Sequence, residues 1–302
     1  MKLRFNIGGA FAQSNQLIMF FHRNKENLNR FDITVYDGIS NCSWNGGRIN
    51  RDITYTDEVI NFYYRNNISI ALTFSNPIVD LDDKTGNELL QKFHKEGNYI
   101  ISINDKLREY IRASFPKYKH TRSITGFGDI DMPMSDKDFN RYKNLEDKYD
   151  SIVPRSEHVF DKRFKDLSVN RYEIMLNDTC IYGCPYYGEH FEKIAEQNRL
   201  YRKPWKEGGH DEMYEVEECW LSDRSTYLKC SSFNPDIGHL AAIKKHGEDY
   251  GMDLTTKQIE RLIQMGVYNF KLTGREMKIE DYEHELNSYL NPFILHGKAK
   301  KI

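Results

Sequence analysis

The sequence lacks a long apolar run, an excess of charge of either sign and a hydrophobic leader. No apolar stretch in its 302 residues approaches the ~20 residues of a transmembrane helix, which argues against a membrane protein. Residues 1–5 (MKLRF) already alternate between apolar and polar side chains, so we expect no signal peptide and a cytoplasmic location. Lys and Arg total 43 and Asp and Glu 45, and a formal net charge of -2 gives no general reason to wrap nucleic acid.

Several catalytic motifs are also absent. There is no GxxxxGK[ST] loop, no HExxH and no GxSxG elbow, which argues against a P-loop site, a zincin peptidase and a serine hydrolase of the α/β type. A CxxxCxxC triad of the radical-enzyme kind is missing too. The chain has five cysteines, and an odd number in a reducing compartment indicates metal ligation, a reactive thiol or buried thiols rather than a disulfide framework.

Runs typical of β-strands alternate with stretches typical of helices. Most of the runs are continuously apolar or β-branched, as expected for strands buried on both faces of a parallel sheet. Alternating strands and helices predict right-handed crossovers, and eight such units predict one (β/α)8 barrel, of the TIM-barrel type, over residues 1–302. The predicted strands are Leu3–Ile7, Phe31–Tyr36, Ser69–Phe74, Tyr99–Ile103, Arg122–Thr125, Asp150–Val153, Tyr172–Leu176 and Tyr268–Leu272.

Capping residues predict where three helices begin and end. Thr56 is a candidate N-cap for one helix, and Asn104 precedes another that Pro116 would stop. Thr255 or Thr256 would cap a third helix, which Gly266 would end at the entry to the eighth strand.

One interval between strands is much longer than the others. The seventh and eighth strands are separated by an insertion over residues 177–266, on the carboxyl side of a strand. In a barrel this is the face on which active sites are built. The insertion contains four of the five cysteines: Cys180, Cys184, Cys219 and Cys230.

Cys180 and Cys184 lie in the segment 177–185 (NDTCIYGCP), directly after the seventh strand. Two nearby thiolates can bind one metal centre, and Cys219 and Cys230 would complete a set of four for an iron–sulfur cluster. Zinc is the competing metal, and unligated buried thiols are the alternative without a metal. Cys42, after the second strand, would replace Cys230 if that residue is not the fourth ligand.

Three cationic residues are candidates for binding an anion at the barrel mouth. Arg48 ends the segment 41–48 (NCSWNGGR), and Lys271 and Arg275 lie in 270–276 (FKLTGRE) at the end of the eighth strand. An Arg can hold a carboxylate bidentately, although a solvated Arg48 and rim carboxylates paired with the other two are equally consistent with the sequence. His190 follows the cysteine pair and would be a proton donor or ligand, or else a surface histidine of a helix.

These motifs together resemble the collagenase-like peptidase family. The resemblance lies in ND-x-C at 177–180, CP at 184–185, HF at 190–191, SF-x-PD at 232–236 and GV-x-x-FKL-x-GR at 266–275, and extends more weakly over most of the chain. That family includes unassigned-type peptidases, accessory proteins of oxygen-independent ubiquinone hydroxylation and bacterial RNA hydroxylation proteins. This chain departs from the pattern at Thr273, where the family usually has Glu, and at Cys230, which precedes Asp236 rather than following it.

The resemblance implies a (β/α)8-like barrel with a 4Fe–4S cluster held by four cysteines. It also implies, for several members, hydroxylation without dioxygen and with prephenate as the oxygen donor, acting on a quinone precursor, an RNA base or a peptide. Two other functions stay open: peptide hydrolysis, and a scaffold with a structural metal that docks a partner enzyme. The roles expected here are metal ligation by the four late cysteines, substrate binding by Arg48, Lys271 and Arg275, and catalysis by His190 and Arg275.

Overall fold

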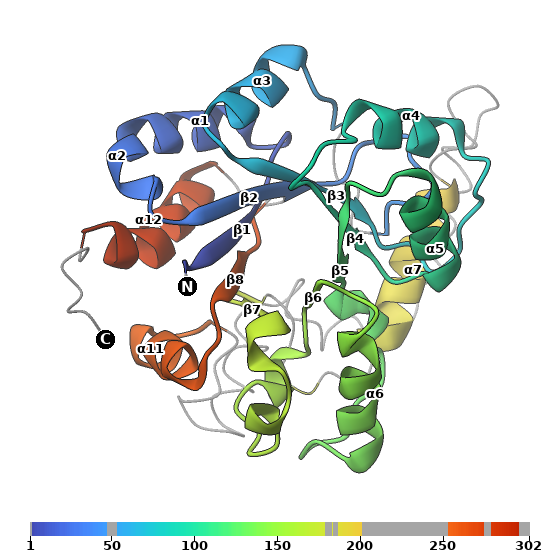
Figure 1. Ribbon diagram of the computed structural model, residues 1–302, viewed down its shortest axis with the longest axis vertical. Helices are drawn as coiled ribbons and strands as arrows, with labels where there is room; N and C mark the ends of the chain where they lie inside the picture. The colour runs from blue at the N-terminus through green and yellow to red at the C-terminus, as the bar shows by residue number, and fades with distance from the viewer. Residues whose placement is uncertain are drawn as a thin grey trace.

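Eight parallel strands form one sheet in the order β6-β5-β4-β3-β2-β1-β8-β7 (Figure 1). The computed structural model describes residues 2–46, 53–178, 183, 187–200, 253–274 and 279–295. The strands are β1 (Arg4–Gly8), β2 (Asp32–Asp37), β3 (Ser69–Phe74), β4 (Tyr99–Ser102), β5 (Lys119–Arg122), β6 (Ser151–Ile152), β7 (Glu173–Met175) and β8 (Asn269–Leu272).

A parallel bridge between Ile152 and Tyr172 joins the two ends of this sheet, so the strands make a nearly closed barrel. β1 pairs with both β2 and β8, as a closed barrel requires. The TIM-barrel-like α/β fold predicted from the alternation of strands and helices is therefore confirmed.

Helices surround the strands as an outer layer (Figure 1). The connection from β6 to β7 differs, because it contains three short 3-10 turns (Ser156–His158, Phe164–Asp166 and Val169–Arg171) in place of an α-helix. No helix within the described ranges is both long and apolar enough to cross a bilayer. The helices are α1 (Ser14–Arg23), α2 (Lys25–Leu28), α3 (Asp57–Arg65), α4 (Lys84–Lys92), α5 (Asp105–Ser114), α6 (Asp136–Glu146), α7 (Tyr187–Leu200), α11 (Thr256–Met265) and α12 (Ile279–Leu295).

The predicted helix caps are present. The side chain of Thr56 accepts a hydrogen bond from Val59 N, and that of Asn104 accepts one from Leu107 N. Of the two threonines considered for α11, Thr255 is the N-cap, and it makes a reciprocal capping box with Gln258. Gly266 ends the same helix with φ 100°, a left-handed conformation that favours glycine.

The fifth strand was predicted at Arg122–Thr125 but lies at Lys119–Arg122. Residues 124–126 form a 3-10 turn, capped by Ser123. The error arose because β5 (KHTR) has no apolar residue, so its hydrophobicity gave no signal. Its pairing with β4 on one side and β6 on the other makes this polar segment a strand.

The two faces of the barrel wall differ in chemistry. Outward residues such as Phe5, Ile7 and Val35 belong to the main hydrophobic core between strands and helices. Inward positions alternate with them and include polar residues such as Asn6, whose side chain donates to Glu173 on β7, two strands away. A hydrogen bond of 2.7 Å between the hydroxyls of Thr121 and Ser151 lies on the same inner face.

His120 on β5 makes the fold sensitive to acid. Its side chain is 1% exposed, and neither ring nitrogen has a hydrogen-bond partner among the described residues. Burial lowers the pKa of His120 from 6.5 to about 4, with Arg112 adding to this effect and Asp150 opposing it. The folded state therefore keeps the ring neutral at a pH at which the unfolded chain already binds a proton.

We expect the free energy of unfolding to fall by about 3 kcal/mol as the pH drops from about 6.5 to about 4, because protonation of His120 favours the unfolded chain there. Above about pH 6.5 the ring is neutral in both states, so His120 causes no loss of unfolding free energy there. Urea unfolding across this range should show a smaller pH dependence in His120→Leu than in the wild type. Equal slopes for the two proteins would contradict this assignment.

Candidate functional site

The carboxyl ends of the strands form the mouth of the barrel, where the predicted site residues were expected. His190, Lys271 and the alternative ligand Cys42 lie within the described residues. The other predicted site residues lie outside them: Arg48, Cys180, Cys184, Cys219, Cys230 and Arg275. The roles of these six residues therefore stay predictions, and the structure describes only nearby residues such as Gly46, Asp178, Gly183 and Gly274.

Asn177 fixes the point at which the cysteine-bearing segment leaves the barrel. Its side chain accepts a hydrogen bond of 2.8 Å from Thr273 N and donates to the Thr273 carbonyl at 3.2 Å. Asn177 also forms an antiparallel bridge with Asp253, and Leu254 N donates to Leu176 O at 2.8 Å. The chain thus leaves and rejoins the barrel at one place, between β7 and β8.

A buried ion pair contacts Gly183, which lies between Cys180 and Cys184 in the sequence. Arg155 and Glu157 contact each other at 2.6 Å with both side chains 1% exposed. The same carboxylate accepts a hydrogen bond of 3.0 Å from Gly183 N, between the two cysteines. Burial alone would lower the pKa of Arg155, but the adjacent Glu157 outweighs it and holds that pKa above its usual range.

Two further contacts join Asp178 and Tyr187, the described residues on either side of the cysteine pair, to the residues after β6. Ser156 donates a hydrogen bond of 2.7 Å to the buried carboxylate of Asp178. The guanidinium of Arg155 lies 3.5 Å from the centre of the Tyr187 ring, at the start of α7. A stacked guanidinium of this kind adds attraction to the packing, so both flanks of the cysteine pair are tied to the residues that follow β6.

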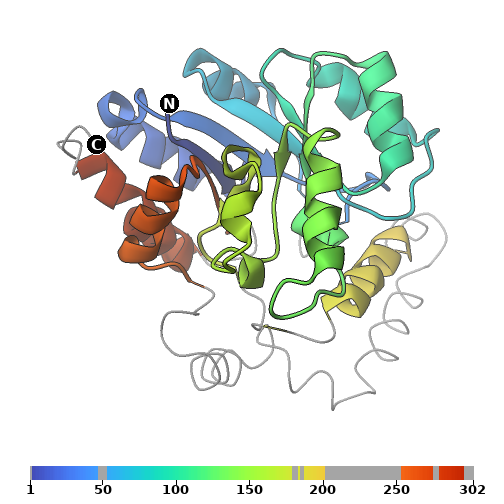
Figure 2. The same ribbon diagram turned by 60° about the horizontal axis from the view of Figure 1, so that its bottom comes forward.

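α7 lies along one side of the barrel, next to α6 (Figure 2). At its start, Tyr187 packs with Val153 and Met175 in a small hydrophobic cluster. Further along, the carbonyl of Ala195 accepts a hydrogen bond of 3.3 Å from the side chain of Asn76, after β3. His190 lies one turn after Tyr187 and is 8% exposed, so it is a buried residue rather than a surface histidine.

Lys271 lies inside the barrel. Its ammonium is 3.5 Å from Glu173 Oε1 and 4.1 Å from the centre of the Tyr36 ring. Arg4 approaches the other carboxylate oxygen at 3.8 Å, and Asn6 donates to it at 2.7 Å. The charge of Lys271 is therefore shared with a carboxylate of β7, which is the paired arrangement that the sequence left open.

Cys42 is 1% exposed and belongs to the main hydrophobic core. Within the part of the chain that the structure describes, no three His, Cys, Asp or Glu side chains gather as a metal site. The predicted cluster therefore depends on the four late cysteines, and a ligand role for Cys42 would require its buried side chain to leave the core.

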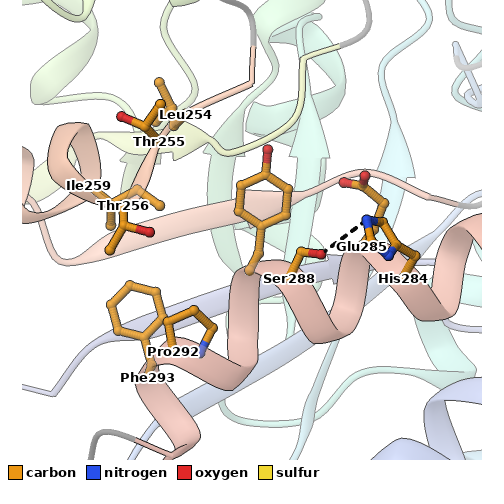
Figure 3. Close-up of a pocket in the computed structure, with 10 residues that line it drawn as sticks. Leu254, Thr255, Thr256, Ile259, His284, Glu285, Ser288, Pro292 and Phe293 are labelled. Carbon is orange, nitrogen blue, oxygen red and sulfur yellow. Dashed lines mark hydrogen bonds between the residues drawn. The ribbon is translucent and has the colours of Figure 1, made fainter.

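A groove of about 410 Å³ lies between α11 and α12 in the outer layer (Figure 3). Ser288 and His284 on its α12 side are hydrogen-bonded at 3.3 Å. Burial raises the pKa of Glu285 in the same wall, while a hydrogen bond from Asn177 opposes that effect. This links the groove to the junction of β7 and β8, but it contains none of the predicted site residues.

The sequence did not single out Arg155, Glu157 or Glu173. Each acts through an ion pair. Arg155 and Glu157 pair within one tight turn, and Glu173 pairs with Lys271 on another strand, so no sequence motif marks them. Arg155 and Glu157 are close in sequence, so a buried pair two residues apart after a strand was the one signal available. Glu173 gave no such signal, because Asn6 and Lys271 are distant along the chain.

No protein-family model matches the chain, and no curated protein matches it in sequence. Among solved structures, the chain is similar to the structure of the U32 peptidase Mk0906. The two align over 91% of this chain and 93% of that chain, with 9% identity and a TM-score of 0.49. A likeness at this level concerns the course of the chain and assigns no activity to it.

We expect Glu157→Gln to lower the free energy of unfolding by about 3–5 kcal/mol, because it leaves the Arg155 charge buried without its partner. Urea unfolding measures this loss. Glu88→Gln is the matched control, since Glu88 belongs to an exposed pair with Lys84 and should cost no more than about 0.5 kcal/mol. Similar losses in both variants would show that the Arg155–Glu157 pair has no special role.

We expect Lys271→Met to lower the free energy of unfolding by about 3 kcal/mol, because it removes one of two cations from a buried carboxylate. In the double variant with Glu173→Gln, the loss should be smaller than the sum of the two single losses. If Lys271→Met is as stable as the wild type and only anion binding falls, the lysine has a ligand-binding role instead.

Proposed function

We propose that this chain is an iron–sulfur protein whose cluster is held by Cys180, Cys184, Cys219 and Cys230 at the mouth of the barrel. We further propose that the site hydroxylates an acceptor without dioxygen, with an anionic oxygen donor of the prephenate type. The acceptor class is a quinone precursor, an RNA base or a peptide, and a partner protein would present it.

The observation that supports this most is the junction of Asn177 with Thr273 and Asp253. It ties both ends of the cysteine-bearing segment to the barrel mouth, where barrel enzymes build their sites. Glu157 of the Arg155–Glu157 pair also accepts a hydrogen bond from Gly183 N, between the first two cysteines in the sequence. Four thiolates are the usual donor set for a 4Fe–4S cluster, and they also suit a structural zinc.

The protein's own residues would bind and orient the donor. Arg48 and Arg275 would hold its carboxylates, since a guanidinium matches that group with two parallel hydrogen bonds. Lys271 would contribute a charge that it shares with Glu173, and Arg275 would also stabilise negative charge on the reacting group. His190, a buried residue of α7, would hold or donate a proton. A bound cluster would supply the redox chemistry.

Two alternatives predict different metal contents. A peptidase needs a nucleophile with a base, or a catalytic metal with an open coordination position. A scaffold for a partner enzyme needs only a closed structural site, for which zinc is the usual metal. Iron with acid-labile sulfide favours our proposal, whereas zinc without sulfide favours the scaffold.

We expect anaerobically purified protein to be brown and to contain about four iron and four sulfide per chain. Cys180→Ala and Cys184→Ala should lose both, because each removes a ligand thiolate, and should also unfold more easily since metal binding is coupled to folding. Iron and sulfide analysis and unfolding measure these effects.

Cys42→Ala is the matched control, since it removes a cysteine that is buried in the apolar core, and it should keep the cluster. If Cys42→Ala loses iron while Cys230→Ala keeps it, Cys42 is the fourth ligand. A colourless wild-type protein without sulfide after anaerobic purification would overturn the proposal.

A further inference from the structure

A cavity of about 430 Å³ opens at the barrel mouth between the carboxyl ends of β3, β4 and β5 and the helix α7. Ser75, Ile103 and Thr125 line it from the strand ends, and Phe191 lines it from α7. It is separate from the charge cluster around Glu173 inside the barrel, and every residue that lines it is described by the structure.

Two arginines line this cavity from different elements. Arg122 ends β5, and its guanidinium donates to the carbonyl of Ile103, to Gly126 O at 3.4 Å and to the Tyr149 hydroxyl at 3.3 Å. Arg141 comes from α6 and donates to the same Gly126 carbonyl. One carbonyl oxygen therefore holds both guanidinium groups at the cavity wall.

Neither guanidinium forms an ion pair with a carboxylate among the described residues. Asp105 also lines the cavity, but its carboxylate accepts hydrogen bonds from Arg108 at 2.8 Å and Tyr149 at 3.3 Å. Glu192 is an exposed residue of the same lining. Burial and then the charge of Arg122 lower the pKa of Arg141, while the more weakly acting charges of Asp138 and Asp129 oppose that effect.

Glycine at position 126 is required for this arrangement. A Cβ atom there would lie 2.6 Å from Nη2 of Arg122, so any side chain would displace that guanidinium. Gly128 in the loop after β5 and Gly188 in α7 allow these two segments to approach closely, since a Cβ on Gly188 would lie 3.2 Å from the Gly128 Cα. These glycines thus leave room for both guanidinium groups at the cavity wall.

We propose that this cavity binds a small oxyanion, a carboxylate or a phosphate group, between Arg122 and Arg141. Such a group offers two or three acceptor oxygens and supplies the negative charge that the pair lacks. The site is additional to the predicted anion site at Arg48, Lys271 and Arg275 and involves no cysteine. Its failure would leave the proposed iron–sulfur function untouched.

Isothermal titration of the full chain with inorganic phosphate and with malonate, at constant ionic strength with chloride as the background anion, tests this proposal. We expect at least one probe to bind, and the tighter one identifies the class of ligand. Arg141→Gln should weaken that binding about ten-fold or more, because it removes a charge-assisted hydrogen-bond donor. Arg163→Gln is the matched control, since Arg163 pairs with Asp136 at the start of α6, and it should bind within about two-fold of the wild type.

Thermal unfolding without added anion separates ligand binding from a structural role. Loss of one of two repelling charges should leave the midpoint of Arg141→Gln unchanged or raise it, and should abolish the rise that the bound anion causes in the wild type. Arg122 also anchors Ile103 and Tyr149, so Arg141 is the informative position. A lower midpoint for Arg141→Gln, equal binding by both variants, or binding of an RNA oligonucleotide with no binding of either small probe would overturn the proposal.

Discussion

The carboxylate of Glu173 balances the charge inside the barrel, and the geometry of the mouth depends on that balance. It accepts a hydrogen bond from Asn6 of β1 and lies within 4 Å of the cations of Arg4 and Lys271. Among the described residues, one bridge between Ile152 and Tyr172 is the strand pairing that joins the β6 and β7 sides of the barrel. The cluster at Glu173 adds side-chain contacts from β7 to β1 and β8. Without the carboxylate, two cations would repel each other in a nearly dry interior.

The position of β7 in turn decides where the cysteine-bearing segment begins. Asn177 follows β7 closely, and its side chain is hydrogen-bonded to the backbone of Thr273 after β8. The pairing of β7 with β8 therefore sets where the segment leaves the barrel and where it returns. On the opposite flank, Glu157 binds both Arg155 and the backbone of Gly183. Asn177 and Gly183 are thus fixed by buried polar contacts, which require a defined geometry in a way that apolar packing does not.

The sequence predicted the parts of this structure that depend on local signals. β3 has the predicted bounds, and Thr56, Asn104 and Gly266 mark helix ends through their own side chains or backbone conformation. β5 was misplaced because its residues are polar and only its neighbours make it a strand. The cluster around Glu173 and the pair formed by Arg122 and Arg141 were not predictable, since each joins residues that only the closed barrel brings together.

The cations in and around the barrel fall into two groups with different energetic roles. Lys271 and Arg155 are matched by Glu173 and Glu157, so their charges are neutralised where water is excluded and they stabilise the fold. Arg122 and Arg141 instead share one carbonyl oxygen, which cannot neutralise them. A fold that places carboxylates so consistently beside its buried cations would gain stability from one more at this wall. Retaining an unmatched pair at the mouth is the expected trade-off of stability for binding, in which the missing negative charge comes from the ligand.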